Sequence, residues 1–282
     1  MIAVVDYQKG NLKSVERGLI AAGGEAFITA DASEIAKADA IVLPGVGAFA
    51  DAAATMCELG QMDVIRERVR AGVPFLGICL GEHLMFEHGV EGAPEGNPAC
   101  GLGLLPGTVV AMPRYDAQGK AFKVPHVGWN TIEIPACGGS AAVPPCGEGG
   151  GNAVLSSGGA GGGAARSSAA KRGLFEHGAF PGSAPQVGSE LAFPDSTPQP
   201  GSDLAFACPL FNGIAPGEYF YFTHSFIAPT GSHTIAETTH SVRFTSAVQF
   251  GECAFGVQFH PEKSSDAGAR VLANFVAIAA RG

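Results

Sequence analysis

The first part of the chain alternates short apolar runs with longer stretches in which apolar residues recur every three or four positions. The short runs are typical of buried strands, and the longer period is typical of helices with one buried face. The expected elements are, in chain order, a strand at 2–6, a helix starting at 12, a strand at 25–29, a helix at 33–38, a strand at 40–43, helices at 49–59 and 61–71, and a strand that begins at 75. Repeated strand–helix–strand units predict an α/β fold with a mostly parallel sheet and helices on both faces.

The first helix has recognisable ends and a recognisable buried face. Asn11 is placed to cap its start, and Gly23 and Gly24 end it. The residues expected on its apolar face are Leu12, Val15, Leu19 and Ile20.

The later part of the chain is dominated by short strands. They are expected at 107–112, 128–134, 218–226, 234–240 and 247–257. The last element is an amphipathic helix at 267–279, with Val271, Phe275 and Ile278 toward the core.

Between these two parts, at about 136–207, the composition changes to Gly, Ser, Ala and Pro. Ordering a backbone costs about 1–2 kcal/mol per residue, and this stretch has too few apolar side chains to offset that cost. We therefore expect a disordered or loosely packed insertion that interrupts a single domain.

Composition excludes several classes of protein. The chain has 282 residues, 46% of them hydrophobic, and a net charge of −9 with its basic residues dispersed, which argues against nucleic-acid binding. No apolar run is long enough to cross a bilayer, and no signal peptide opens the sequence. The seven cysteines include no Cys-x-x-Cys pair. We expect a cytoplasmic protein with reduced cysteines and no metal site.

The strand that begins at Phe75 runs into Cys79, which stands between Gly77 and Gly81. A strand, a sharp turn and small neighbours are the pattern of a nucleophile elbow. A thiol has an ordinary pKa of about 8.5, so it needs a helix N-terminus and an imidazole to become a nucleophile at neutral pH. Leu84, Met85 and Phe86 suggest that a helix continues from the elbow.

His260 follows the apolar strand 255–259, and Glu262 stands two residues further on. Since catalytic groups gather at the carboxyl ends of strands in open α/β sheets, Cys79, His260 and Glu262 fit a triad. Each signal alone also fits a structural role, because cysteines are often small buried apolar residues.

The loop that follows strand 40–43 reads Leu43-Pro44-Gly45-Val46-Gly47. Attack on a carbonyl creates an oxyanion that backbone N–H groups must stabilise. We expect those N–H groups to belong to Val46, Gly47 and Leu80. A tight strand-to-helix turn is the alternative interpretation of the loop.

Six motifs together resemble a known family. They are Asp6-Tyr7 with Gly10-Asn11-Leu12, Pro44-Gly45-Val46-Gly47, Gly77-Ile78-Cys79-Leu80-Gly81, Pro125-His126-Val127-Gly128-Trp129-Asn130, Tyr221-Phe222-Thr223-His224-Ser225 and the run from Gly256 to Ser264. Their order is similar to that of the glutaminase subunits of imidazole glycerol phosphate synthase, within the class I glutamine amidotransferases. The resemblance covers nearly everything except the insertion, and it implies one flavodoxin-like, three-layer domain over 1–282.

The resemblance also implies an activity. Cys79 attacks the side-chain amide of glutamine, His260 protonates the leaving ammonia and then activates water, and Glu262 orients His260. No cofactor takes part. The ammonia passes to a cyclase subunit with a (β/α)8 barrel, which forms imidazole glycerol phosphate and an aminoimidazole carboxamide ribotide in histidine biosynthesis.

By the same resemblance, the chain binds glutamine through Gly47, His83, Ser225 and Phe226, and its partner through Asn11, Tyr221 and Lys263. Glu82 and His83 stand where the family usually has Met and Gln. A neutral histidine has one donor and one acceptor on opposite sides of its ring, so its contact with glutamine differs from that of Gln.

Two other functions are compatible with the sequence. The chain fits another class I amidotransferase subunit or a free-standing glutaminase, which partner dependence distinguishes. A non-catalytic scaffold with a degenerate glutamine pocket fits the Glu82-His83 departure, but the complete set of Cys79, His260 and Glu262 argues against it.

Overall fold

The computed structural model describes residues 1–134 and 208–281. The insertion expected at about 136–207 therefore lies outside the described residues. The helices and strands are, in chain order, β1 (Ile2–Val5), α1 (Leu12–Ala21), β2 (Ala26–Thr29), α2 (Ala32–Ile35), β3 (Ala40–Gly45), α3 (Phe49–Glu58), α4 (Gln61–Arg70), β4 (Phe75–Cys79), α5 (Leu80–His83), β5 (Phe86–Gly89), β6 (Ala99–Cys100), β7 (Leu105–Ala111), β8 (His126–Thr131), η1 (Pro209–Phe211), β9 (Tyr219–His224), β10 (Phe226–Ile227), β11 (Thr234–Thr239), β12 (Arg243–Phe250), β13 (Ala254–Val257), η2 (Pro261–Lys263) and α6 (Ser265–Ala279).

Strands from both ends of the chain form the central sheet. In the described part of the chain it has seven strands, in the order β11-β12-β13-β4-β3-β1-β2. The strands from β13 to β2 are parallel, whereas β12 and β11 add to the β13 edge as antiparallel strands. The prediction of a mostly parallel sheet is confirmed.

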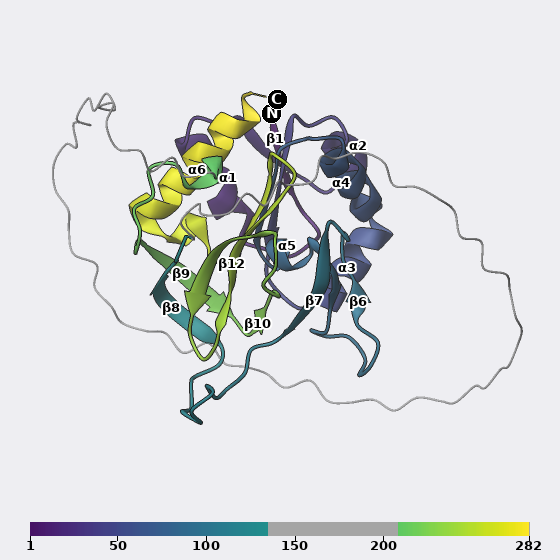
Figure 1. Cartoon of the computed structure of the whole chain (residues 1–282). Coiled ribbons are helices and arrows are strands. Elements are labelled where there is room, and N and C mark those ends of the chain that lie inside the picture. Colours follow the sequence, from purple (N-terminus) through teal and green to yellow (C-terminus); the bar gives the residue numbers. More distant parts are fainter. Residues whose placement is uncertain (135–207, 282) are drawn as a thin grey trace, which may run out of the picture. The chain divides into compact units, whose positions relative to one another are not determined.

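Helices cover both faces of this sheet (Figure 1). α1 and α6 lie on one face, and α2, α3 and α4 lie on the other. Each face of the sheet has its own hydrophobic core, and neighbouring residues of β1 pack into different ones. Ile2 and Val4 pack with residues of α1 and α6, while Val5 packs with residues of α3 and α4. A strand buried on both faces reads as a continuous apolar run, which explains why the sequence pattern was clear here.

Four details differ from the sequence predictions. The strand expected at 247–257 is a hairpin of β12 and β13, because the chain turns at Gly251, whose φ of 60° favours glycine. The side chain of Asn11 makes no cap hydrogen bond to any described residue. Ile20 is 52% exposed, so the apolar face of α1 consists of the buried Val15 and Leu19 with the partly buried Leu12. The strands β5 and β6 were not expected.

Two smaller sheets complete the description. β10, β7, β5 and β6 form one of them, and β8 pairs with β9 in the other. The pairing of β8 with β9 runs without interruption from His126 opposite His224 to Thr131 opposite Tyr219. β8 and β9 are therefore adjacent in space although residues 132–218 separate them in sequence. Among the described residues, no helix has the length and apolar composition needed to span a bilayer.

Candidate active site

Cys79 stands at a sharp turn between β4 and α5. Its φ of 54° and ψ of −107° lie in a region that L-residues rarely adopt, which is the strained backbone expected of an elbow. Gly81 makes the turn possible, because a Cβ there would lie 1.8 Å from the carbonyl oxygen of Leu43. A Cβ at Gly77 would lie 2.5 Å from the carbonyl oxygen of Gly81. Only glycine at these positions lets α5 pack directly against β3 and β4.

The helix after Cys79 is shorter than expected. α5 ends at His83, and Phe86 begins β5 instead of continuing the helix. Phe86 pairs with Leu105 of β7 and is fully buried. The prediction of a helix through Phe86 was wrong because this residue is held by the smaller sheet.

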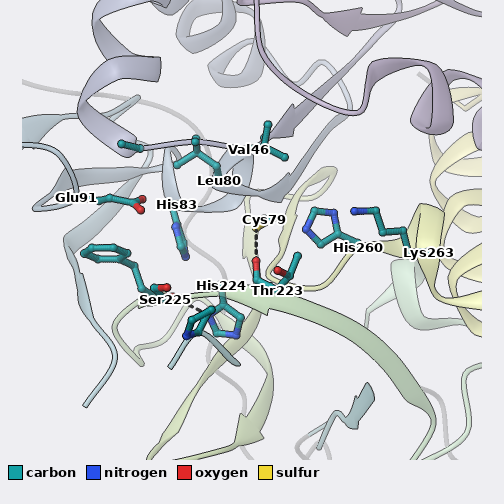
Figure 2. Close-up of a pocket in the computed structure, with 15 residues that line it drawn as sticks. Val46, Cys79, Leu80, His83, Glu91, Thr223, His224, Ser225, His260 and Lys263 are labelled. Atoms are coloured by element: carbon teal, nitrogen blue, oxygen red, sulfur yellow. Dashed lines mark hydrogen bonds between the residues drawn. The ribbon is translucent and has the colours of Figure 1, made fainter. Parts of the chain in front are cut away.

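Cys79 lines a pocket of about 540 Å³ (Figure 2). Residues 45–48 after β3 form one part of its wall, residues 223–226 of β9 and β10 form another, and His260 follows β13. Figure 2 shows the ring of His260 beside Cys79. The carboxyl ends of neighbouring parallel strands thus bring together two residues that are distant in sequence.

Hydrogen bonds to both its side chain and its backbone hold His260 in place. Its Nδ1 lies 2.9 Å from Oε1 of Glu262, and both side chains are almost fully buried. The His260 backbone N–H donates to the carbonyl of Tyr221, and the Ser264 hydroxyl donates to the carbonyl of His260. Nε2 of His260 has no hydrogen-bond partner among the described residues.

Burial lowers the pKa of His260, but Cys79 and Glu262 outweigh it and raise this pKa to about 9. His260 is therefore protonated at neutral pH. A protonated imidazole beside a sulfur stabilises the thiolate and holds a proton for a leaving group.

The sulfur of Cys79 has a second polar neighbour that the sequence did not reveal. Nε2 of Gln258 lies 3.6 Å from Sγ, and Oε1 of the same amide lies 2.7 Å from Nε2 of His83. Gln258 directly follows β13, two residues before His260, at the sheet edge where catalytic groups gather. That position was the signal that could have identified it.

The expected oxyanion residues Val46, Gly47 and Leu80 all line the pocket. The N–H of Val46, however, donates to the hydroxyl of Tyr7 at 3.1 Å. Burial raises the pKa of Tyr7, so this residue remains a neutral phenol. In the observed arrangement the Val46 N–H is engaged by Tyr7 and is not available to an oxyanion.

The remaining predicted residues fall into two groups. His83, Ser225, Phe226 and Gly47 line the pocket, as does Lys263, which we had expected at a partner interface. Asn11 and Tyr221 are outside the pocket lining. The lining also contains residues that sequence reasoning missed: Glu91, Thr223 and His224. Residues 1–134 and 208–281 contain no cluster of His, Cys, Asp or Glu suited to a metal ion.

Glu82 lies next to this site but outside the pocket lining. It is fully buried, and neither carboxylate oxygen has a hydrogen-bond partner in the described part of the chain. Burial, and secondarily Cys79, raises the pKa of Glu82 well above its usual range. Burial of Glu82 near the sulfur of Cys79 thus favours its neutral form.

Known proteins resemble this chain in both sequence and fold. The family model of glutamine amidotransferase class-I matches residues 3–134. The imidazole glycerol phosphate synthase subunit HisH of Moorella thermoacetica is 34% identical, over 97% of this chain and 93% of that protein. The subunit of the same name from Rhodopirellula baltica is 33% identical, over 98% of this chain and 96% of the relative.

Among solved structures, a glutamine amidotransferase aligns with a TM-score of 0.56 and 15% identity, over 99% of this chain and 100% of that one. At this identity the likeness supports the fold, an α/β sheet flanked by helices.

Proposed function

The chain belongs to the class I glutamine amidotransferases, in the family of HisH subunits of imidazole glycerol phosphate synthase, and from this premise we propose that Cys79, His260 and Glu262 hydrolyse glutamine. The observation that carries this assignment is the geometry around His260. One ring nitrogen is bound by buried Glu262, and the ring lies beside Cys79 at the elbow.

The reaction starts with attack of the Cys79 thiolate on the side-chain carbonyl carbon of glutamine. Protonated His260 gives its proton to the amide nitrogen, so the carbon–nitrogen bond breaks and ammonia leaves. The acyl group remains on sulfur as a thioester. Neutral His260 then takes a proton from water, which attacks the thioester and releases glutamate. Glu262 stabilises the imidazolium in both halves of the reaction.

The pocket wall offers groups suited to the rest of the substrate. Glutamine carries an α-ammonium group, and Glu91 supplies a carboxyl group within the same pocket as Cys79. Ser225, Phe226 and Gly47 line the remaining wall near the sulfur. We assign glutamine binding to these residues.

The conformation of the loop from Pro44 to Gly47, which we call the oxyanion loop, supports a partner-dependent activity. Because Tyr7 engages the Val46 N–H, the loop must rearrange before Val46 can stabilise an oxyanion. The glycines on either side of Val46 allow this, and Gly47 already has a φ of 102°. We therefore propose that the chain hydrolyses glutamine slowly alone and faster in complex.

The proposed partner is a cyclase subunit with a (β/α)8 barrel, which uses the ammonia to form imidazole glycerol phosphate and an aminoimidazole carboxamide ribotide. An exposed apolar strip on β8 and β9 is a suitable docking surface. Val127, Trp129 and Tyr219 are each more than half exposed, and Trp129 contacts Tyr221 edge to face. We assign Asn11, Tyr221 and Lys263 to the partner interface and expect the reaction in the cytoplasm, where Cys79 stays reduced.

The test measures glutamate release from glutamine by the purified chain, with and without a barrel cyclase subunit and its ribonucleotide ligand. We expect release that the partner stimulates and that Cys79→Ala abolishes, while the complex still uses added ammonium. Stimulation by no cyclase would indicate another amidotransferase. Absence of Cys79-dependent release in every condition would refute the proposed function.

A further inference from the structure

The side chains of His83, Gln258 and Cys79 contact one another in a row that ends at the sulfur. His83 contacts Gln258 at 2.7 Å, and Gln258 contacts the sulfur of Cys79 at 3.6 Å. Gln258 is fully buried and His83 is 3% exposed, so water does not compete for these contacts. Cys79 ends β4 and His83 ends α5, while Gln258 follows β13. These contacts therefore link the elbow, which carries Cys79, to the segment that carries His260.

The direction of these hydrogen bonds follows from the charge of His83. Burial lowers the pKa of His83 to about 4, so its ring is neutral at pH 7 and one nitrogen carries a hydrogen. Nε2 of His83 lies against Oε1 of Gln258, an acceptor, so the observed amide orientation requires the Nε2–H tautomer of His83, which donates this hydrogen bond.

In this tautomer the hydrogen bond from His83 keeps one end of the amide toward the sulfur. The oxygen and nitrogen ends of a glutamine side chain are nearly equal in size, and only hydrogen bonding selects between them. With Oε1 bound by His83, the N–H group of Gln258 points at Cys79. The reverse orientation would place a carbonyl oxygen against a sulfur that becomes negative in the reaction.

We propose that His83 is a positioning residue that holds the Gln258 amide with its N–H toward Cys79, so that this N–H stabilises the thiolate. The inference rests on the proposed function, because it concerns the nucleophile of that reaction. It gives His83 a different task from the one expected from the sequence, where it contacts glutamine directly. The two tasks predict different kinetics, since a positioning role changes kcat and a binding role changes KM.

Other ionisable groups lie near Cys79, and the test has to hold them constant. They are Tyr7 after β1, Glu82 on α5, Glu91 and Lys263 in the pocket wall, His224 on β9, and the His260–Glu262 pair. Uncharged substitutions at Gln258 and His83 leave all of them in place.

The test compares wild type with Gln258→Met, which removes the N–H, and with His83→Phe, which removes its donor. His83→Gln is the rescue variant, because a Gln amide nitrogen reaches about as far as Nε2 of histidine. His88→Phe on β5, outside the pocket lining, is the matched control for a histidine-to-phenylalanine change.

The readout is the rate of alkylation of Cys79 by iodoacetamide from pH 6 to pH 10, followed by mass spectrometry of the Cys79 peptide. Thermal melts by circular dichroism confirm that each variant is folded.

We expect alkylation at pH 7 to slow about ten-fold in Gln258→Met and His83→Phe, and to converge with wild type at high pH, where thiols ionise without help. His83→Gln should restore most of the rate, and His88→Phe should match wild type. In glutamine hydrolysis, kcat should fall in the first two variants while KM changes little.

Equal alkylation rates in folded variants would overturn the proposal, as would a rise in KM with unchanged kcat. These results differ from a failure of the proposed function itself. That failure appears in the wild type, as glutamine hydrolysis that survives complete alkylation of Cys79.

Discussion

Replacing Glu82 by Met should stabilise the protein. The Glu82 side chain is fully buried, and its two oxygens have no hydrogen-bond partner among residues 1–134 and 208–281. Its surroundings are apolar, since a Cβ at Gly256 would approach the Cγ of Glu82, the sulfur of Met85 and a methyl group of Val248 to between 2.7 and 2.8 Å. A buried polar group without a partner costs about 1–3 kcal/mol, and methionine fills a similar volume without oxygens. We expect Glu82→Met to raise the free energy of unfolding by about this amount in acid.

The gain in the free energy of unfolding from Glu82→Met should grow as the pH rises. The pKa of Glu82 is raised in the folded protein, so the folded state keeps a proton that the unfolded chain releases above the usual value of 4.5. Stability that depends on this proton is complete below pH 4.5 and is lost as the pH rises toward the folded pKa. The methionine variant has no such loss.

The assay is urea unfolding of both proteins at pH 4.5, 6 and 8, followed by circular dichroism. Glu58→Met, at an exposed position on α3, serves as the control and should change stability little. A loss of stability in Glu82→Met, or a gain that stays the same at all three pH values, would refute the reasoning. Either result would mean that the carboxyl group is solvated or paired.

Three further predictions concern the Val46 loop, the elbow, and the buried residues His126 and His224, whose ring nitrogens lie 3.0 Å apart. Tyr7→Phe leaves the Val46 N–H without its partner, so glutamate release by the isolated chain should rise several-fold; an unchanged or lower rate contradicts this. Burial lowers the pKa of His126 to about 4 and lowers that of His224, so their contribution to stability is present above about pH 6.5 and is lost as the pH falls toward 4. Urea unfolding should show this loss, and His126→Phe should reduce its slope. Gly81→Ala places a Cβ against a backbone carbonyl and should cost about 3 kcal/mol or more, measured by thermal and urea unfolding; wild-type stability would mean that the elbow can shift without strain.

The parallel sheet could be predicted because its strands are buried on both faces and their apolar runs are continuous. The triad candidates could be predicted because each follows such a strand, at the edge where parallel strands end. These inferences need only the local sequence and one rule about sheet edges.

The errors have a common physical origin in contacts between distant segments. Phe86 fits a helix locally, but pairing with β7 holds it in a strand. Gln258 and Tyr7 were missed as site residues because their roles depend on Cys79 and Val46, which are 179 and 39 positions away. A single sequence read for periodicity does not contain that information.

The pairing of β8 with β9 has a consequence for how this protein can change. Thr131 and Tyr219 are opposite each other at the end of the pairing, so β8 and β9 are fixed to each other by their own hydrogen bonds and not by the segment that joins them. Doubling the length of a connection adds only about 0.6 kcal/mol of closure cost, so length here is nearly neutral for stability. His224 stays in register with His126 whatever lies between the two strands. The part of the connection between residues 134 and 208 is thus a natural attachment point, where a reporter domain can be grafted while Leu210, Phe211 and Ile214 keep their places in the core.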